Sequence, residues 1–254
     1  MFDELKGKAV LVTGSSTGIG AAVAKGFGRL GAEVVVHYNR SAAEAEAVAG
    51  TIRAAGGKAA VVQGDVSDSA VARRVVDEAA ERCGGLDILI NNAGHMVERR
   101  LIAEADDDIL DRVVDLNIRS VIAATGAAVP HFRRRGKGNI VNVSSIAARN
   151  GGSAGAGIYA AAKGFVSTLT HGLAREHAQD NIRVNAVAPG VILTPFHERY
   201  STKAQLEAAR QTIPMGRFGS AEECVGVVLF LATDALSSYV TGQVIEVNGG
   251  QLMP

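Results

Sequence analysis

The sequence predicts an α/β fold in which helices cover both faces of one doubly wound parallel sheet. Short apolar runs rich in β-branched residues, as expected of buried strands, alternate with longer stretches of helical spacing. Each strand–helix pair occupies roughly 25–30 residues, which is typical of a parallel sheet with crossover helices. No linker, low-complexity tract or fixed-period repeat divides the 254 residues. We therefore expect a single domain over 1–254.

Local signals place the individual elements in chain order. Apolar, β-branched runs predict strands at 8–13, 33–37, 59–64, 86–91, 139–143, 183–188 and 243–247. Helical spacing predicts helices at 21–30, 41–55, 68–83, 106–135, 158–179 and 221–233. Ser67 and Ser220 precede acidic residues, so each is expected to cap a helix N-terminus. The stretch 106–135 is expected to be largely helical, and Gly126 and Pro130 mark where an interruption could fall.

Composition excludes several classes of protein. The net charge is zero, which gives no general attraction to nucleic acid or to an anionic membrane. Cys83 and Cys224 lack metal-ligand spacing and are expected to be free thiols in a reducing compartment, so no metal site is predicted. The N-terminus lacks the pattern of a signal peptide, and no uncharged apolar run approaches the length of a membrane span. We expect a cytoplasmic protein.

A glycine-rich turn follows the first predicted strand. Gly14, Gly18 and Gly20 lie in TGSSTGIG at 13–20, between that strand and the first helix. Unpaired N–H groups at a helix N-terminus bind a diphosphate, and glycines let the diphosphate approach them. The spacing is G-x-x-x-G-x-G, and the alternative interpretation is an ordinary tight βα turn. The strand–turn–helix context favours a dinucleotide site.

The end of the second strand distinguishes the two nicotinamide dinucleotides. NAD sites usually carry an acidic residue there, which binds the ribose 2′-hydroxyl. This chain has Tyr38, Asn39 and Arg40 instead, with no acid between Glu33 and Glu44. Arg40 could hold a 2′-phosphate through paired donors, although a solvated loop arginine is the alternative. The sequence favours NADP(H), with NAD(H) as the alternative cofactor.

Tyr159 and Lys163 are spaced i and i+4 on a predicted helix, so their side chains share one face. A tyrosine has a pKa near 10 in solution, and an adjacent ammonium group is expected to lower it. Ser145 follows a predicted strand at the edge where open α/β sheets bind ligands, and it could polarise a carbonyl oxygen. Taken alone, a YxxxK pair is usually structural, and a serine after a strand is usually a cap.

Together these motifs resemble the short-chain dehydrogenase/reductase family. The ordered set is TGSSTGIG at 13–20, NNAG at 91–94, Asn117, Ser145, YAAAK at 159–163 and PGVILT at 189–194. The resemblance runs from Lys8 to Gly250. It implies a single-domain, Rossmann-like parallel sheet of about seven strands. It also implies an oxidoreductase that transfers a hydride between nicotinamide and a ketone or secondary alcohol.

The resemblance also implies roles for individual residues. Those expected at the pyrophosphate and adenosine ribose are Gly14, Ser16, Gly18, Ile19 and Gly20. Asp65 and Val66 are expected at the adenine, and Asn91, Ala93 and Gly94 at the ribose and the sheet. The nicotinamide end would be held by Pro189, Gly190, Ile192 and Thr194. Catalysis would use Tyr159 as general acid or base, Lys163 on the nicotinamide ribose, Ser145 on the substrate oxygen and Asn117 on a water.

Two features depart from common family patterns. Thr17 stands where many NADP-dependent members have a basic residue, and the glycine-rich segment 147–158 is about one residue longer than in many relatives. Within the family the chain resembles 3-oxoacyl-carrier-protein reductases and related ketone reductases. That resemblance implies a homotetramer and a substrate lid at about 190–215. His95, directly after NNAG, could face the substrate, although a loop histidine is the more ordinary interpretation.

Two other functions remain open at this point. One is an NAD-dependent dehydrogenase that oxidises a sugar, a steroid or another secondary alcohol. The other is a nucleotide-binding regulator without catalysis, which would be expected to have lost Tyr159 or Lys163; this chain has both. Nothing in the sequence identifies the small-molecule carbonyl or alcohol substrate itself.

Overall fold

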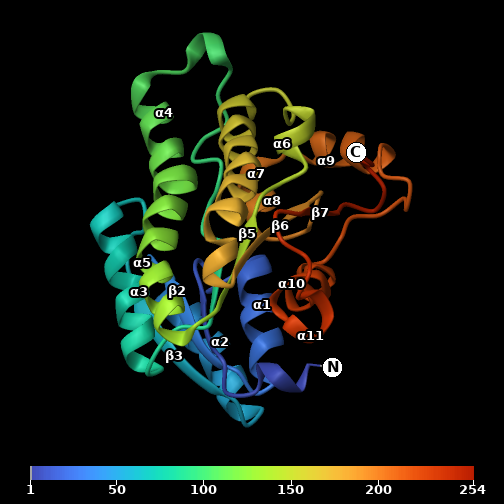
Figure 1. The fold of residues 1–254 in the computed structure, drawn as a ribbon. Coiled ribbons are helices and arrows are strands. Elements are labelled where there is room, and N and C mark those ends of the chain that lie inside the picture. Colours follow the sequence, from blue (N-terminus) through green and yellow to red (C-terminus); the bar gives the residue numbers. More distant parts are fainter. Residues whose placement is uncertain (1) are drawn as a thin grey trace.

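One parallel sheet with the strand order β3-β2-β1-β4-β5-β6-β7 runs through the computed structural model, which describes residues 2–254. Figure 1 shows this sheet between two layers of helices. The seven strands confirm the predicted fold class, and their bounds lie close to the predicted runs. They are β1 Ala9–Val12, β2 Glu33–Tyr38, β3 Lys58–Gln63, β4 Ile88–Asn91, β5 Gly138–Val143, β6 Ile182–Pro189 and β7 Val244–Val247.

The strand order reverses beside β1. Val12 of β1 is in register with Val36 of β2 on one side and with Ile90 of β4 on the other. The chain therefore runs outward from β1 to β3 and then returns to the opposite side of β1. Because the strands are parallel, their carboxyl ends meet at one edge. In open α/β sheets, a crevice for ligands forms at that edge where the order reverses.

Helices cover both faces of the sheet because successive strand residues point to opposite sides. Val10 and Val12 contribute to a core with α1, α2 and α10, whereas Leu11 contributes to a second core with α3 and α5. Each fully buried aliphatic side chain contributes about 1.5–3 kcal/mol relative to exposure, so these two layers supply most of the stability.

The helices have the following bounds in the structure. The α-helices are α1 Gly18–Arg29, α2 Ala42–Ala54, α3 Ser69–Arg82, α4 Asp107–Val114, α5 Ser120–Arg135, α6 Ala147–Asn150, α7 Gly157–His177, α8 Pro195–Tyr200, α9 Lys203–Gln211, α10 Val225–Ala232 and α11 Asp234–Ser237. The short 3₁₀ helices are η1 Asp3–Leu5, η2 Ile102–Glu104, η4 Ala178–Asp180 and η5 Ala221–Cys224, and η3 Asp115–Arg119 is a π-helical turn.

The irregularity in the long helix lies earlier than the sequence predicts. Gly126 and Pro130 do not interrupt it, because α5 continues through both residues. Burial of Ala128, Val129 and Phe132 against the sheet and α3 outweighs the poor helix propensity there. The departure from regular helix is instead the wide π turn η3 Asp115–Arg119, which joins α4 to α5.

The expected cap of α3 also needs correction. Asp68, rather than Ser67, is the N-cap, and its carboxylate accepts hydrogen bonds from the backbone N–H groups of Ala70 (2.7 Å) and Val71 (3.1 Å). Ser67 instead donates its hydroxyl to Asp65 at 2.7 Å. Ser220 does begin a helix as predicted, but that helix is divided into η5 and α10.

By length and composition alone, the stretch Asp107–Arg135 is apolar enough to cross a membrane. Half of its apolar window is buried inside the fold, and its α5 part packs against α3 and β5. That packing is typical of the core helix of a globular domain.

Candidate active site

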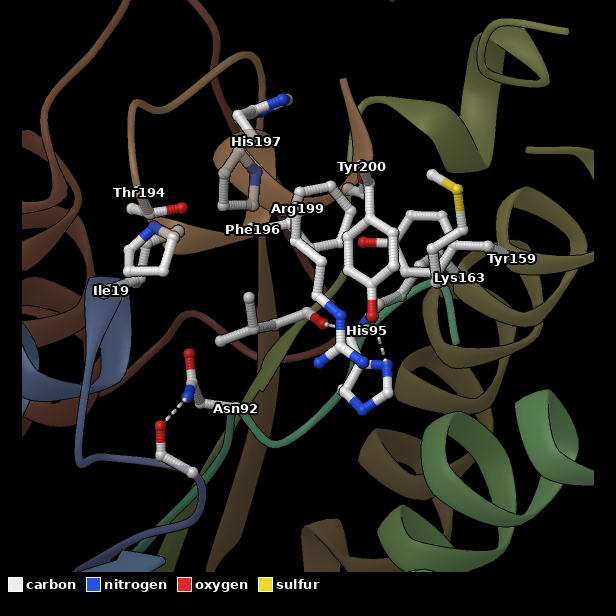
Figure 2. Close-up of a pocket in the computed structure, with 18 of the residues that line it drawn as sticks. Ile19, Asn92, His95, Tyr159, Lys163, Thr194, Phe196, His197, Arg199 and Tyr200 are labelled. Atoms are coloured by element: carbon white, nitrogen blue, oxygen red, sulfur yellow. Dashed lines mark hydrogen bonds between the residues drawn. The ribbon is translucent and has the colours of Figure 1, made fainter. Parts of the chain in front are cut away.

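A cleft of about 870 Å³ lies at the carboxyl ends of the central strands. Its walls come from the turns after β1 to β6, together with α7 and α8. Figure 2 shows side chains from α1, from the segment after β4, from α7 and from the segment 194–200 around the cleft. Its volume lies in the upper part of the range for small-molecule sites, which is roughly 300–1,000 Å³.

The glycine-rich turn forms one end of the cleft and suits a diphosphate. Thr17, the N-cap of α1, makes no side-chain capping bond within the described chain, so the first N–H groups of this 12-residue helix remain available. Gly14 has a φ of +62°, and a Cβ there would lie 2.9 Å from Cα of Ala93. A Cβ on Gly20 would lie 2.4 Å from Nδ2 of Asn92. The turn therefore needs glycine both to fold and to leave the helix N-terminus open.

The adenosine end of the cleft contains the residues expected there. Tyr38, Asn39, Arg40, Asp65 and Val66 all line it. Arg40 is exposed, and Val66 is buried. Burial works against the charge of Asp65, but hydrogen bonds from Ser67 and Asn39 and the charge of Arg40 lower the pKa of Asp65 overall. No group of three or more His, Cys, Asp or Glu in residues 2–254 is arranged to hold a metal ion.

His37 joins the glycine turn to the adenosine end, a role that the sequence did not indicate. Its Nδ1 accepts a hydrogen bond from the N–H of Gly14 at 2.9 Å, and its Nε2 lies 3.0 Å from the carbonyl of Gly64. Because a backbone N–H can only donate, the ring hydrogen is on Nε2 and points to Gly64. The side chain is buried, and burial lowers the pKa of His37 to about 4. The imidazole is therefore neutral near pH 7.

Ser145, Tyr159 and Lys163 meet at the opposite end of the cleft. Ser145 follows β5, and the other two residues lie one turn apart on α7. Ser145 hydrogen-bonds the hydroxyl of Tyr159, and the ring of Tyr159 lies 5.7 Å from that of Phe196 between centroids. Nζ of Lys163 is 5.8 Å from the centroid of the Tyr159 ring and donates to the carbonyl of Val143 at 2.8 Å. Figure 2 shows the tyrosine and lysine side by side.

The expected lowering of the Tyr159 pKa does not appear in the protein alone. Burial raises the pKa of Tyr159 to about 12, and the Ser145 hydrogen bond only partly offsets this rise. Burial also lowers the pKa of Lys163 to about 8. Removing a group from water disfavours its charged form, and this effect dominates both shifts. Tyr159 is therefore protonated at neutral pH, as a general acid must be before it gives up a proton.

Asn117 lies behind the cleft wall, in the π turn η3. Its Nδ2 donates to the carbonyls of Val113 (2.9 Å) and His95 (3.0 Å), whereas its buried Oδ1 has no partner within the described residues. A Cβ on Gly94 would lie 2.7 Å from that Oδ1 and 3.0 Å from Nζ of Lys163. The glycine thus keeps a small space open between the orphan acceptor and the lysine.

One predicted cofactor residue lies outside the cleft. Asn91 is buried within the sheet layer, where its Nδ2 donates to Asn142 (2.9 Å) and Thr125 (3.2 Å). Its neighbour Asn92 lines the cleft instead, and its Nδ2 donates to the carbonyls of Thr13 and Gly14. The other predicted cofactor residues do line the cleft: Ser16, Gly18, Ile19, Ala93, Gly94, Pro189, Gly190, Ile192 and Thr194.

The far wall, next to Tyr159, is formed by α8 and the segment after β4. His95 lines it, and its Nδ1 is 3.1 Å from the hydroxyl of Tyr200. Arg99 donates to the carbonyl of Tyr200 at 3.0 Å and, through its other end, to Ser153 and Ala154. Val97 between them has a φ of +66°, which is strained for a β-branched residue. Strained backbone of this kind is concentrated at functional sites.

A family model described as enoyl-(acyl carrier protein) reductase matches residues 14–251 of this chain. The match covers the glycine turn, the Ser145–Tyr159–Lys163 group and the last strand. The chain belongs to the short-chain dehydrogenase/reductase family. It is therefore an oxidoreductase of the kind that acts on alcohols and ketones with a nicotinamide cofactor.

Curated relatives span nearly the whole chain. A 3β-hydroxysteroid dehydrogenase of Eggerthella lenta is 40% identical over 259 residues, which cover 100% of this chain and 97% of the relative. A 3-oxoacyl-[acyl-carrier-protein] reductase of Thermotoga maritima is 40% identical over 246 residues, 97% of this chain and 98% of the relative.

Solved structures of the family superpose closely on this fold. The NADH-dependent reductase A1-R′, complexed with NAD, has a TM-score of 0.89 and 40% identity, with full coverage of both chains. A short-chain dehydrogenase from Burkholderia cenocepacia in complex with NADP has a TM-score of 0.91 and 36% identity, covering 97% of this chain and 98% of the other. Relatives of similar likeness thus hold either of the two dinucleotides.

Proposed function

We propose that this family member is an NADP(H)-dependent reductase that converts a ketone to a secondary alcohol, with Tyr159 as the general acid. The observation that carries the proposal is the meeting of Ser145, Tyr159 and Lys163 at one end of a cleft whose other end is an open helix N-terminus. Burial keeps the Tyr159 hydroxyl protonated, so it is ready to give its proton to a ketone oxygen. The same site can run in reverse.

Each residue at this end has a distinct part in the chemistry. The bound nicotinamide supplies or takes up the hydride. Tyr159 gives a proton to the substrate oxygen, and Ser145 donates a hydrogen bond to the same oxygen as charge develops on it. Lys163 would bind the ribose of the nicotinamide, and its charge would stabilise the Tyr159 phenolate left after proton transfer. The orphan Oδ1 of Asn117 is suited to accept a hydrogen bond from a water that links Lys163 to solvent.

The preference for NADP(H) depends on Arg40. Its exposed guanidinium borders the adenosine end, where the strand carries no acid to bind a ribose 2′-hydroxyl. A guanidinium can donate two parallel hydrogen bonds to a phosphate. NAD(H) is the alternative, since Thr17 supplies no second positive charge in the glycine turn. One family structure is complexed with NADP and another with NAD.

For the substrate we propose a 3-oxoacyl compound or another small ketone. The alternative is a secondary alcohol of the sugar or steroid type, oxidised with NAD. The names of the relatives include both a 3-oxoacyl reductase and a hydroxysteroid dehydrogenase. The family model is described as an enoyl reductase, but Ser145 beside Tyr159 favours a reacting oxygen over an isolated carbon–carbon double bond.

We further propose a lid over the substrate at about 190–215, a homotetramer and a cytoplasmic location. Segment 190–215 contains α8 and α9, and α8 borders the substrate end of the cleft. Association is supported by exposed apolar side chains on the outer helices, Leu110, Ile122 and Phe165, and by the fully exposed Tyr239. Light scattering after size-exclusion chromatography tests the tetramer directly.

The Tyr159→Phe variant tests the chemistry, and a panel of ketones and alcohols with both cofactors tests the substrate class. We expect kcat for ketone reduction to fall by at least about 100-fold, as loss of general acid catalysis requires, while the affinity for NADPH stays unchanged. Tyr239→Phe, which alters an exposed tyrosine outside the cleft, is the matched control. A Tyr159→Phe enzyme of full rate would contradict the proposal. A wild-type protein that binds NADPH but turns over no ketone, alcohol or enoyl compound would favour the non-catalytic regulator.

A further inference from the structure

The substrate end of the cleft carries positive charge without matching negative charge. Within residues 2–254, Arg199 on α8 forms no ion pair and no hydrogen bond. Arg99 donates hydrogen bonds to two backbone carbonyls and one hydroxyl, and none of these groups carries a negative charge. Arg112 is different, because it is paired with Asp108 at 3.1 Å.

The acidic residues that line the cleft do not offset these arginines. They are Asp65, at the adenosine end near Arg40, and Asp115, which is paired with Arg119. Arg199 and Arg99 therefore leave the substrate end with a local excess of positive charge, although the chain as a whole has a net charge of zero. Partly enclosed walls concentrate such a field and favour ligands of the opposite sign.

Arg199 is directed along the cleft wall toward His95. Its Cζ lies 5.3 Å from the centroid of the Tyr200 ring, and Figure 2 shows its guanidinium pointing toward the His95 ring. Burial lowers the pKa of His95, and the charge of Arg199 adds to this; burial raises the pKa of Tyr200, and the charge of Arg199 opposes that rise. Arg199 is exposed and lines the cleft, so its guanidinium is open to a ligand there.

His95 adds a neutral donor to this arginine. The N–H of Val97 donates to its Nδ1 at 2.9 Å, so the ring hydrogen is on Nε2. Burial and the nearby charge of Arg199 lower the pKa of His95 to about 4, which keeps the imidazole neutral at pH 7. Its Nε2–H has no hydrogen-bond partner among the residues that the structure describes. The wall thus offers the charged guanidinium of Arg199 and the free Nε2–H of His95.

A row of aromatic rings connects this donor pair to the reacting tyrosine. The Tyr159 and Phe196 centroids are 5.7 Å apart, and those of Phe196 and Tyr200 are 5.0 Å apart. Tyr200 in turn contacts Arg199 and His95. A substrate with its ketone at Tyr159 would lie along these rings, so its other end would reach the arginine.

We propose that the ketone substrate carries a carboxylate at the end remote from the reacting carbonyl, and that Arg199 and the Nε2–H of His95 bind this carboxylate. The enzyme would then be a reductase of oxo acids. This inference depends on the proposed ketone reduction and names the substrate class for the same site. Arginine is well matched to the task because its fork of donors fits the two carboxylate oxygens.

Matched pairs of an oxo acid and its methyl ester test the proposal, for example 8-oxononanoate and methyl 8-oxononanoate, whose chain is long enough to follow the row of rings. We expect kcat/KM with NADPH to be at least about tenfold higher for the acid, the size of effect given by a charge-assisted hydrogen bond. The ratio should fall as ionic strength rises, because salt screens the attraction. Nonanoate, which has no ketone, should compete with the oxo acid, whereas nonanamide should not.

Variants of Arg199 test whether this residue causes the preference for the acid over the ester. Arg199→Gln should lower kcat/KM for the acid by about 10- to 100-fold, mainly through KM, and leave the ester within about twofold. Arg199→Lys should retain part of the preference because it keeps the charge but loses the fork. Arg134→Gln, which removes the same charge from the far end of α5, is the control and should change neither substrate.

The outcomes separate this inference from the proposed function. Equal kcat/KM for acid and ester, or an acid preference unchanged in Arg199→Gln, would overturn the carboxylate site and leave ketone reduction intact. Failure to reduce any ketone, charged or neutral, with either cofactor would overturn the proposed function itself.

Discussion

Nδ1 of His37 accepts a hydrogen bond from the backbone N–H of Gly14 at 2.9 Å. The end of β2 therefore holds the first glycine of the phosphate-binding turn in place. Through its Nε2, the same imidazole reaches the carbonyl of Gly64, just before Asp65. One buried ring thus fixes the two loops that would hold opposite sides of the adenosine diphosphate.

We expect the protein to lose stability as the pH falls from about 6.5 to about 4 because His37 must remain neutral. In the unfolded chain this histidine takes up a proton near pH 6.5, whereas in the fold its pKa is about 4. Between these values the unfolded state binds more protons, so stability rises with pH. The contribution of His37 lost between pH 7.5 and pH 5 is about 2 kcal/mol.

Denaturant unfolding at pH 7.5, 6 and 5 measures this loss of stability. Two histidine variants then test whether His37 is its cause. His37→Asn should be less stable at pH 7.5 and should show a smaller decrease toward pH 5 than the parent protein. His171→Asn, which alters an exposed histidine on α7, should keep the slope of the parent. An unchanged slope in His37→Asn would show that another group controls the acid transition.

Arg40→Ala should weaken the binding of NADPH but not the binding of NADH. Loss of a charge-assisted contact to the 2′-phosphate should raise KM for NADPH by about 10- to 100-fold and leave NADH within about twofold. Steady-state kinetics with both cofactors and one ketone measure the ratio. Arg53→Ala, on the exposed side of α2, is the control. If KM for NADPH and KM for NADH change by the same factor, Arg40 does not contact the 2′-phosphate.

Gly20→Ala should weaken both cofactor binding and folding. The new Cβ would lie 2.4 Å from Nδ2 of Asn92 and 2.6 Å from the carbonyl oxygen of Gly14, so the turn must shift. Overpacking of this kind costs about 1–3 kcal/mol of unfolding free energy. We also expect at least a tenfold loss of NADPH affinity in a fluorescence titration.

The matched control for that variant is Gly50→Ala in α2. A Cβ there meets nothing within 4 Å, so alanine should stabilise the helix by up to about 1 kcal/mol and leave NADPH binding unchanged. Similar behaviour of the two variants would mean that the glycine turn has more freedom than its contacts indicate.

The charge of Lys163 should appear in the pH profile of cofactor use. Burial lowers the pKa of Lys163 to about 8, so its ammonium is lost as the pH rises through that value. We expect kcat/KM for NADPH to fall above pH 8, since this parameter reports ionisations of the free enzyme. In Lys163→Arg the fall near pH 8 should disappear, whereas Lys58→Arg, at the exposed start of β3, should retain it. A profile unaffected by Lys163→Arg would assign the ionisation elsewhere.

Much of the fold could be predicted because its signals are local. Each strand is a short apolar run, and the positions of Gly14, Gly18 and Gly20 fix where β1 ends and α1 begins. The strand ends then bring Ser145 and α7 to the same edge of the sheet. Parallel pairing follows from the alternation of strands and helices, so the location of the cleft follows as well.

The remaining features depend on contacts distant in sequence. Nothing in residues 115–119 breaks helical spacing, and the π turn is held by the bonds of Asn117 to Val113 and His95. His37 resembles any strand residue until Gly14 and Gly64 are brought to its two nitrogens. Arg199 is one of several charged residues in its segment, and only the folded position of α8 shows that it faces the cleft.

The π turn at Asp115–Arg119 limits the changes in chain length that the protein can accept. Removing one residue there would favour a regular helix from α4 into α5, and each residue of a regular helix turns the chain by about 100°. The buried Ala124 and Ala128 of α5 would then rotate away from the sheet, and Asn117 would leave its place beside Gly94. Substitutions on the exposed side of this segment should therefore be accepted, whereas a single-residue deletion would disrupt the core and the active site together.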